Sequence, residues 1–446
     1  MVKFAQLPKY EAYKDSGVEW LGEIPCGWSL KPGFVAFSEN KRSNKGMIEN
    51  TVLSLSYGHI VIRPEEKLTG LVPESFETYQ LVEPGDIIVR CMDLQNDKVS
   101  LRTGLSKSKG IITSAYLNLK VNNDFESRFI HYYLHSLDTT KVLYRFGSGL
   151  RQNLSFLDFK RLPVFSIPKN IQTIIADYLD QKTAQIDAAI AIKEQQIELL
   201  KERKQIIIQQ AVTQGLDPNV PMKDSGVEWI GQIPEHWNYI KLKHFIDVLP
   251  GFAFQSEAYS SNGNDIKLLR GVNVGPDLVK WSEVVYWSKD KMAGLDKYQL
   301  EEGDLVIAMD RPWISTGIRV AEIKAEDLPC LLLQRVGRIR GNKEISTSYI
   351  KLLLSTDLFL NYFEPMLTGI SVPHISAEQI ENFSAPVPLF EEQEKILNFI
   401  RNETDNSNDA IALMFDQIQK LKEYKTTLIN SAVTGKIKIT PEMLQA

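Results

Sequence analysis

The sequence has few cysteines, and they form no pattern that would hold a metal ion or a disulfide framework. Its 446 residues include three cysteines, Cys26, Cys91 and Cys330, which lie far apart and form no Cys-x-x-Cys pair. Zinc sites and disulfide-stabilised domains need paired or closely spaced cysteines. We therefore expect no metal site, and we expect the three side chains to behave as small apolar residues in a reducing compartment.

Long apolar runs are also missing. No stretch approaches the ~18 consecutive apolar residues of a membrane-spanning helix, and residues 1–8 lack the apolar core of a signal peptide. A composition of 43% hydrophobic and 24% charged residues is typical of a globular protein. We expect a cytoplasmic chain whose 446 residues form more than one domain.

The sequence has no excess of positive charge. Its 51 Lys and Arg residues against 56 Asp and Glu residues give a formal net charge of −5. The chain as a whole therefore does not attract nucleic acid. A DNA-binding surface, if there is one, must come from local clusters of positive charge.

Catalytic signatures are missing as well. The sequence contains neither a Gly-x-x-x-x-Gly-Lys-Ser/Thr phosphate loop nor the Asn/Asp-Pro-Pro-Tyr/Phe run of amino-methylating DNA methyltransferases. Residues 146–151 contain Gly-Ser-Gly but lack the third glycine of a dinucleotide loop. His131 and His135 have a tyrosine where a zinc protease needs its glutamate, so we expect half-buried or surface histidines. We predict a chain with no catalytic residues and no cofactor.

What the sequence does contain is a tandem repeat. Residues 14–25, Lys-Asp-Ser-Gly-Val-Glu-Trp-Leu-Gly-Glu-Ile-Pro, recur at 223–234 as Lys-Asp-Ser-Gly-Val-Glu-Trp-Ile-Gly-Gln-Ile-Pro. A tryptophan, Trp28 or Trp237, completes each copy. Shorter matches follow in the same order, namely 83–89 with 301–307, 162–168 with 382–388, and 211–215 with 432–435. A repeat of this length indicates two copies of one structural unit.

Each copy ends in a segment with the heptad spacing of a coiled coil. Its contact residues alternate at intervals of four and three, which places them along one face of a helix. In the first copy they are Ile186, Ile190, Lys193, Ile197, Leu200, Lys204, Ile207 and Ala211. In the second copy they are Ser407, Ile411, Met414, Ile418, Leu421, Lys425, Leu428 and Ala432. Each helix could instead pack on its own domain, but the sustained spacing favours two long helices packed on one another.

These patterns predict the fold class and the domain boundaries. We expect an α/β (α+β) fold in which two globular domains, related as a pseudo-two-fold tandem repeat, are joined by two long antiparallel coiled-coil helices. The second helix has no third domain to reach, so packing back along the first is the simplest way to bury both apolar faces. The predicted segments are 1–170 and 216–389 for the globular domains, and 171–215 and 390–446 for the helical spacers.

Positive charge is concentrated in three windows, 98–123, 139–157 and 328–343, which contain no Asp or Glu. Phosphate contacts need cations, and base edges are read by Arg, Asn and Gln side chains. Any single basic residue could be an ordinary solvated charge, but the windows together predict a nucleic-acid-binding face. Our candidate DNA contacts are Lys41, Arg42, Lys45, Arg90, Arg102, Lys107, Lys109, Arg145, Arg151, Gln152, Asn153, Arg270, Arg311, Arg335, Arg338, Ser371 and His374.

Taken in order, these motifs resemble the specificity subunits of type I restriction-modification systems. The resemblance covers essentially the whole chain. It is carried by the doubled Lys-Asp-Ser-Gly-Val-Glu-Trp segments, the doubled Gly-Asp strands, the helix starts at Pro168/Gln172 and Pro388/Gln393, and the Ala-Val-Thr ends of both helices. One departure is that the first helix start lacks the acidic residue usual before its glutamine, Gln172.

The resemblance implies a non-catalytic subunit that reads a bipartite double-stranded DNA site with two target-recognition domains. Two modification (methyltransferase) subunits, which bind S-adenosylmethionine and methylate adenine, and restriction subunits, which use ATP and Mg, are expected to assemble on it. The resemblance identifies neither the bases that are read nor the residues that contact them. The residues also leave another hypothesis open, a bivalent scaffold that holds two protein partners without reading DNA.

Overall fold

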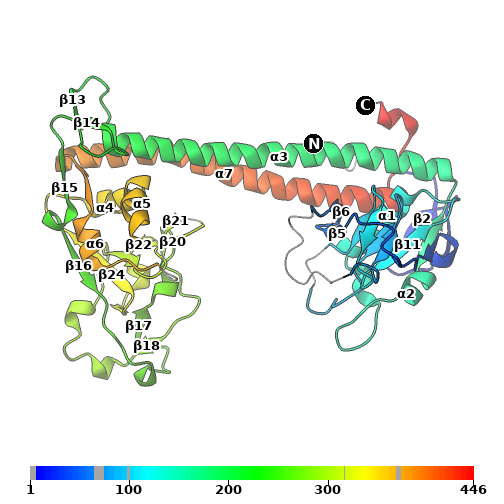
Figure 1. Cartoon of the computed structure of the whole chain (residues 1–446), viewed down its shortest axis with the longest axis horizontal. Coiled ribbons are helices and arrows are strands. Elements are labelled where there is room, and N and C mark those ends of the chain that lie inside the picture. The colour runs from blue at the N-terminus through cyan, green and yellow to red at the C-terminus, as the bar shows by residue number, and fades with distance from the viewer. Residues whose placement is uncertain (1–6, 65–74, 98–100, 316, 368–372, 446) are drawn as a thin grey trace. The chain divides into compact units, whose positions relative to one another are not determined.

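The structure is a computed structural model that describes residues 7–64, 75–97, 101–315, 317–367 and 373–445 (Figure 1). The chain forms two compact units. Unit 1 consists of Met1–Glu194 together with Met414–Ala446, and unit 2 consists of Gln195–Leu413. The C-terminal residues therefore return to the unit in which the chain begins. Within the described ranges, none of the helices combines the length and the apolar character needed to cross a membrane.

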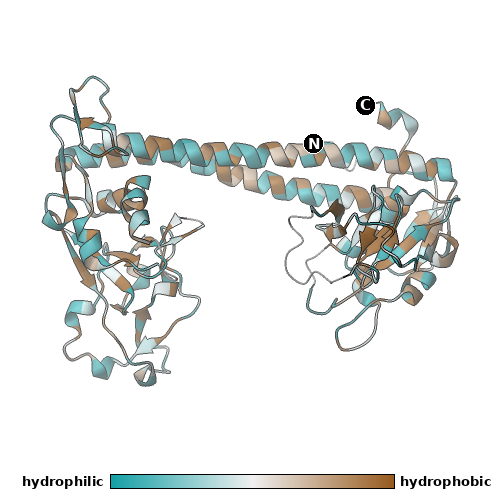
Figure 2. Ribbon diagram, viewed as in Figure 1, coloured by the Kyte–Doolittle hydropathy of each residue, from teal (hydrophilic) through white to brown (hydrophobic). Residues whose placement is uncertain are grey.

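Unit 1 is built around a four-stranded antiparallel sheet. Its order is β4-β11-β8-β9, with β4 at Phe37–Glu39, β11 at Leu117–Val121, β8 at Ile87–Val89 and β9 at Thr103–Leu105. All residues of β8 are buried, which requires cover on both faces of this central strand. Helix α1 (Ser127–Thr139) packs against β9, and Figure 2 shows the hydrophobic residues of the unit gathered in its strands.

The other elements of unit 1 are short. Its further strand pairs are β1 (Tyr13–Asp15) with β2 (Glu23–Pro25), β3 (Ser29–Pro32) with β12 (Pro163–Ser166), β5 (Leu53–Ser56) with β6 (His59–Ile62), and β7 (Gln80–Val82) with β10 (Gly110–Ile112). Its short helices are η2 (Gly33–Val35), η4 (Val142–Arg145), α2 (Phe156–Arg161) and η12 (Pro441–Leu444).

Unit 2 repeats the central sheet of unit 1 with the second copy of the sequence. Its four-stranded antiparallel sheet has the order β16-β24-β19-β22, with β16 at Ile246–Pro250, β24 at Val336–Gly341, β19 at Leu305–Ala308 and β22 at Val320–Glu322. The buried strand that follows each Gly-Asp pair occupies the same inner position in both sheets. The sequence repeat is therefore a repeat of the fold, and the predicted mixture of helices and strands is confirmed.

Unit 2 also has a second sheet and several shorter elements. A second sheet has the order β18-β17-β23, with β18 at Tyr286–Trp287, β17 at Ile266–Leu269 and β23 at Cys330–Leu332. Its strand pairs are β13 (Met222–Asp224) with β14 (Gln232–Pro234), β15 (Asn238–Lys241) with β25 (Ser384–Val387), and β20 (Trp313–Ile314) with β21 (Gly317–Ile318). Its helices are η5 (Leu242–His244), η6 (Ser256–Ala258), η7 (Gly271–Asn273), η8 (Lys289–Lys291), η9 (Asp296–Tyr298), η10 (Ala325–Asp327), α4 (Thr347–Leu354), α5 (Asp357–Phe363), η11 (Glu364–Leu367) and α6 (Ala377–Asn382).

The repeated Gly-Asp pair forms a turn that feeds the central strand. Asp86 is buried, and its Oδ2 accepts hydrogen bonds from the Glu83 amide at 3.0 Å and from Asn40 Nδ2 at 3.2 Å. Asp304 closes the same turn through the Glu301 amide at 2.8 Å. A buried carboxylate needs partners to offset its desolvation. The repeated aspartate is therefore a structural residue of each sheet.

Two long helices link the sheets, α3 at Lys169–Gln214 and α7 at Phe390–Val433. In unit 1 they lie side by side, as Figure 1 shows. There, Lys193 Nζ donates to Gln417 Oε1 at 2.5 Å, and Lys425 Nζ donates to Asp187 Oδ2 at 2.6 Å. Partner numbers fall along α7 as they rise along α3, so the two helices run antiparallel in this unit.

All the predicted coiled-coil residues are buried or half-buried. Buried are Ile186, Ile190, Ile197, Ala211, Ile418, Leu428 and Ala432. Half-buried are Lys193, Leu200, Lys204, Ile207, Ser407, Ile411, Met414, Leu421 and Lys425. In unit 2, the half-buried Lys204 uses its Nζ to donate to Asn408 Oδ1 at 3.2 Å, so a polar residue in the row is accommodated by a polar partner on the other helix.

The ends of both helices pack on the repeated tryptophans. Gly435, just past α7, has a φ of 73°, and a Cβ added there would lie 2.6 Å from the Pro25 ring and 3.2 Å from the Trp28 ring. Gly215, just past α3, also has a φ of 73°, and its added Cβ would lie 3.2 Å from the Trp237 ring. Only glycine combines this backbone conformation with so close an approach. Trp28 and Trp237 are therefore each covered by the end of a long helix.

The glutamine at the start of each long helix is fully buried and ties the helix to its unit. Gln172 Oε1 accepts from the Glu126 amide at 2.9 Å, while its Nε2 donates to the Ile167 carbonyl at 2.8 Å. Gln393 Oε1 accepts from the Ser346 amide at 2.8 Å, and its Nε2 donates to the Pro388 carbonyl at 2.9 Å. The repeated glutamine thus supplies both a donor and an acceptor to backbone groups that water cannot reach.

We expect Gln393→Ala to lower the free energy of unfolding by about 2–3 kcal/mol, because the Ser346 amide and the Pro388 carbonyl lose their partner in a buried place. Gln172→Ala should act in the same direction. Urea unfolding followed by circular dichroism measures the change. The matched control is Gln185→Ala on the exposed face of α3, for which we expect a change within about 0.5 kcal/mol. Equal losses for Gln393→Ala and the control would contradict the assignment.

Candidate nucleic-acid interface

The residues predicted to contact DNA differ widely in exposure. Exposed are Lys41, Arg42, Lys45, Lys107, Lys109, Arg145, Arg151, Asn153, Arg311, Arg335 and His374. Half-buried are Arg90, Gln152 and Arg270, and buried are Arg102 and Arg338. Ser371 lies outside the described residues. The exposed residues can contact a phosphate or a base without a change in the fold.

Arg102 and Arg338 were wrong predictions, because their side chains are inside the protein. Arg102 is 0% exposed, and its guanidinium is surrounded by backbone carbonyls. Arg338 lies in β24 and donates to the Lys297 carbonyl at 3.2 Å and to Asp247 Oδ2 at 3.1 Å. Charge alone had placed both in the interface, although the side chains of a strand alternate between its two faces.

Two half-buried candidates are also committed to internal hydrogen bonds. Gln152 Nε2 donates to the Tyr144 carbonyl at 2.6 Å and to the Phe146 carbonyl at 2.9 Å. Arg270 donates to the Glu283 carbonyl at 2.6 Å. These side chains shape their loops, and Nε2 of Gln152 and Nη2 of Arg270 are already used within the protein.

Several exposed cations pair with carboxylates at the surface. The pairs are Lys41 with Glu39 at 3.0 Å, Arg42 with Glu83 at 4.0 Å, Lys109 with Glu49 at 3.8 Å, and Arg145 with Glu19 at 3.5 Å. Solvent-exposed pairs of this kind are worth only about 0–1 kcal/mol. A DNA phosphate can therefore replace the carboxylate at small cost.

In unit 1, the turn at 147–154 packs against the loop that follows β8. The Leu154 amide donates to the Cys91 carbonyl at 2.8 Å, and the Asp93 amide donates to Asn153 Oδ1 at 2.9 Å. The tip of this turn presents Leu150, which is 98% exposed, next to the exposed Arg151. An apolar and a cationic side chain thus stand together on a well-supported turn. Charge counting had identified Arg151 but missed Leu150.

In unit 2, the corresponding segments bring two predicted residues, Arg335 and His374, to one acid. The Ile375 amide donates to the Met309 carbonyl at 2.8 Å, as Leu154 does in unit 1. Asp310 Oδ1 then lies 3.3 Å from Arg335 Nη1 and 2.6 Å from His374 Nδ1, with Arg311 next to it in the chain. We call Asp310, Arg311, Arg335 and His374 the Asp310 cluster. Asp310 pairs with Arg335 and His374, and an acid of this kind is invisible to a search for positive charge.

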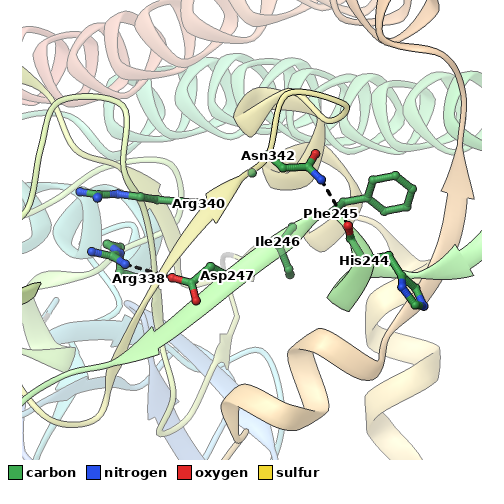
Figure 3. Close-up of a pocket in the computed structure, with 8 residues that line it drawn as sticks. His244, Phe245, Ile246, Asp247, Arg338, Arg340 and Asn342 are labelled. Atoms are coloured by element: carbon green, nitrogen blue, oxygen red, sulfur yellow. Dashed lines mark hydrogen bonds and ion pairs between the residues drawn. The ribbon is translucent and has the colours of Figure 1, made fainter.

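A polar pocket in unit 2 is lined by arginines that pair with carboxylates of the same unit. It has a volume of about 400 Å³ and is lined by His244, Phe245, Ile246, Asp247, Arg338, Arg340, Gly341 and Asn342. Figure 3 shows Arg338 and Asp247 pointing toward one another. Arg340 bonds the buried Asp304, and this hydrogen bond raises the pKa of the Arg340 guanidinium. Both arginines are neutralised within the protein, so the pocket does not offer a cationic site to a ligand.

Comparison with known proteins places these features in a family context. Residues 234–423, which include the Asp310 cluster, match the type I restriction modification DNA specificity domain. The MjaVIII specificity subunit of Methanocaldococcus jannaschii is 28% identical over 336 residues, which cover 74% of this chain and 75% of that protein. The EcoAI specificity subunit of Escherichia coli is 34% identical over 205 residues, which cover 45% of this chain and 34% of that protein.

The fold has a counterpart among solved structures. A chain from a study of complex assembly and conformational transition of the type I R-M system has a TM-score of 0.69 and 14% sequence identity. The match covers 92% of this chain and 98% of that one. At this identity the likeness concerns the fold.

Proposed function

We propose that this chain, which belongs to the family of type I restriction-modification specificity subunits, recognises a bipartite double-stranded DNA site with one target-recognition domain in each unit. It scaffolds two modification subunits and the restriction subunits and is itself non-catalytic. S-adenosylmethionine belongs to the modification subunits, and ATP with Mg to the restriction subunits.

The Asp310 cluster is the observation that carries this proposal. It lies within the stretch that matches the DNA specificity domain, and it combines exposed guanidinium and imidazole groups from separate loops. Arginine side chains pair with phosphates and with guanine edges. Unit 1 supports the same role with Arg151 and Asn153 at the equivalent turn.

The assembly of partner subunits is supported by an apolar surface on the long helices of unit 2. Leu199 and Ile206 are seven residues apart on α3, and Phe399 and Leu413 are fourteen apart on α7. Such spacing places each pair on one helix face, and all four side chains are 39–57% exposed. Exposed apolar rows on helices are typical of protein contacts, which suits a scaffold.

We expect the chain, assembled with its modification subunits, to bind its cognate duplex with an affinity that falls linearly with salt on a double logarithmic plot. Arg311→Gln and Arg335→Gln should each weaken binding about 3–10-fold and lower the salt slope by about one, because each removes one phosphate contact. Fluorescence anisotropy at several salt concentrations measures both quantities.

The control for these variants is Lys201→Gln, which removes an exposed cation paired with Glu198 on α3 and should leave affinity and slope unchanged. A salt-independent affinity for the wild-type complex would contradict DNA reading. That outcome would favour the bivalent protein scaffold instead.

A further inference from the structure

Two arginines occupy the same place in the two sheets. Arg102 directly precedes β9, and Arg319 directly precedes β22. The Arg102 carbonyl accepts a hydrogen bond from the Arg90 amide at 2.8 Å, and the Arg319 carbonyl accepts one from the Ala308 amide at 3.0 Å. The backbone of each arginine is therefore hydrogen-bonded to the point where the central strand ends and its following loop begins.

The guanidinium of Arg102 is fully hydrogen-bonded, mainly to the loop that follows β8 and also to Tyr144 of η4. Its Nη1 donates to the carbonyls of Arg90 at 3.3 Å and Met92 at 2.7 Å. Its Nη2 donates to the carbonyls of Asp93 and Asp97, and its Nε donates to the Tyr144 hydroxyl at 3.1 Å. A guanidinium has five N–H donors, so the acceptors match its full capacity.

Arg319 binds the loop that follows β19 in the same manner. Its Nη1 donates to the carbonyls of Asp310 at 3.2 Å and Arg311 at 3.3 Å. Its Nε donates to the Val274 carbonyl at 2.9 Å, and its Nη2 donates to the Gly271 carbonyl. In both units the arginine thus holds two consecutive carbonyls of the loop, those of Met92 and Asp93 or those of Asp310 and Arg311.

The second residue of each held pair has a left-handed backbone. The φ of Asp93 is 58° and that of Arg311 is 47°, a conformation that costs a non-glycine residue roughly 1–2 kcal/mol. Its amide then donates to a neighbouring segment. In unit 1 the acceptor is Asn153 Oδ1 at 2.9 Å, and in unit 2 it is the Pro373 carbonyl at 2.7 Å. The arginine therefore stabilises a strained residue that joins the two loops of each interface.

Stability alone does not account for an arginine at this place. The acceptors around both guanidinium groups are carbonyls and a hydroxyl, which are neutral. Burying a charge is costly, and burial lowers the pKa of the half-buried Arg319, an effect that the nearby Arg311 strengthens and Asp310 opposes. An apolar side chain would fill the space at less cost, but it could not donate hydrogen bonds to several carbonyls.

We propose that Arg102 and Arg319 are positioning residues that set the base preference of the half-site read by their own unit. Each acts through the loops it holds and touches no DNA itself. This inference rests on the proposed function. It reassigns Arg102 from contact to support and adds Arg319, which charge counting did not select.

Arg102→Lys and Arg319→Lys test the proposal in the full chain with its modification subunits. Lysine keeps the charge, but its compact ammonium cannot reach acceptors spread around a planar fork. Base-resolution mapping of methylated adenine in cells gives the motif read by each variant. For Arg102→Lys we expect methylation at sites with one substituted base in one half to rise at least about tenfold. For Arg319→Lys we expect the same rise in the other half.

The matched controls are arginines that contact other elements. Arg128 in unit 1 pairs with Asp177 at 2.7 Å, and Arg340 in unit 2 pairs with Asp304 at 2.9 Å. Arg128→Lys and Arg340→Lys should leave both halves of the motif as strict as in the wild type, even where they lower the melting temperature as much. If these arginines were merely structural, any loss of stability would relax both halves of the motif equally, whichever arginine is changed.

Two further variants keep the test informative. Tyr144→Phe removes one acceptor of Arg102, so it should relax the same half more weakly even if Arg102→Lys does not fold. Asp93→Gly adopts the left-handed backbone without help, so adding it to Arg102→Lys should restore much of the base preference.

The outcomes separate the two proposals. Unchanged strictness in both lysine variants and in Tyr144→Phe, or relaxation of the same half by both lysine variants, overturns the positioning role. A wild-type complex whose methylation shows no two-part motif overturns the proposed function itself.

Discussion

Exchange of residues 33–161 for the corresponding residues of another specificity subunit will replace one half of the methylated motif and leave the other half unchanged. The loop that follows β8 and the turn at 147–154 both lie within this segment, together with Arg102, which holds that loop. The contacts that cover Trp28 lie outside it, since they come from Pro25 and Gly435. Gln172 also keeps its hydrogen bond, because Oε1 accepts from the backbone amide at position 126, which the exchanged segment supplies whatever its sequence.

Base-resolution mapping of methylated adenine in cells carrying the exchanged gene measures the result. The reciprocal exchange of residues 242–382 in unit 2 is the control, and we expect it to replace the other half only. An unchanged motif after both exchanges would support the bivalent protein scaffold. A motif altered in both halves by one exchange would contradict the assignment of one half-site to each unit.

Acidification from pH 7 to pH 5 will lower the free energy of unfolding by about 2–4 kcal/mol through two histidines of α1. Burial lowers the pKa of His131 to about 3, with a further contribution from His135. Burial also lowers the pKa of His135 to about 4, assisted by Lys425. Both side chains are half-buried, and the buried His131 Nε2 makes no hydrogen bond among the described residues.

The direction follows from proton binding. An unfolded histidine has a pKa of about 6.5, so between about pH 6.5 and pH 4 the unfolded chain binds more protons than the folded chain. Stability is therefore complete above pH 6.5 and is lost as the pH falls, by up to ~1.4 kcal/mol per pH unit for each histidine. Partial exposure reduces this value.

Urea unfolding at pH 7 and pH 5 measures the loss. The double variant His131→Gln with His135→Gln should lose much less stability over this range than the wild type. His244→Gln, which removes an exposed histidine of unit 2, should keep the full loss. If the double variant is as sensitive to acid as the wild type, other groups cause the effect.

The repeat was readable from sequence because its residues meet local demands that depend little on distant contacts. Gly85 and Gly303 supply the positive φ of a turn, and Asp86 and Asp304 close that turn three residues from their amide partners. The heptad rows of the helices reflect a period that any helix imposes. These signals lie within a few residues of one another, so a one-dimensional pattern contains them.

The candidate interface was only partly predictable, because burial decides what a charge can do. Arg102, Arg151 and Arg338 are alike in a charge count, but one is enclosed by carbonyls, one is exposed at a turn and one is bound to Asp247. Asp310 was missed because it is acidic. Arg319 could have been found from the repeat, since it stands before β22 as Arg102 stands before β9.

The sequence by itself therefore determined the repeat, the mixture of helices and strands, the family resemblance and the segments rich in positive charge. The tertiary structure alone decided which of those charges reach solvent and which ones hold a loop. The physical reason is that solvation and hydrogen bonding depend on groups far apart in the chain. Arg102 draws its acceptors from residues 90–97 and 144, and the Asp310 cluster draws its members from three separate loops.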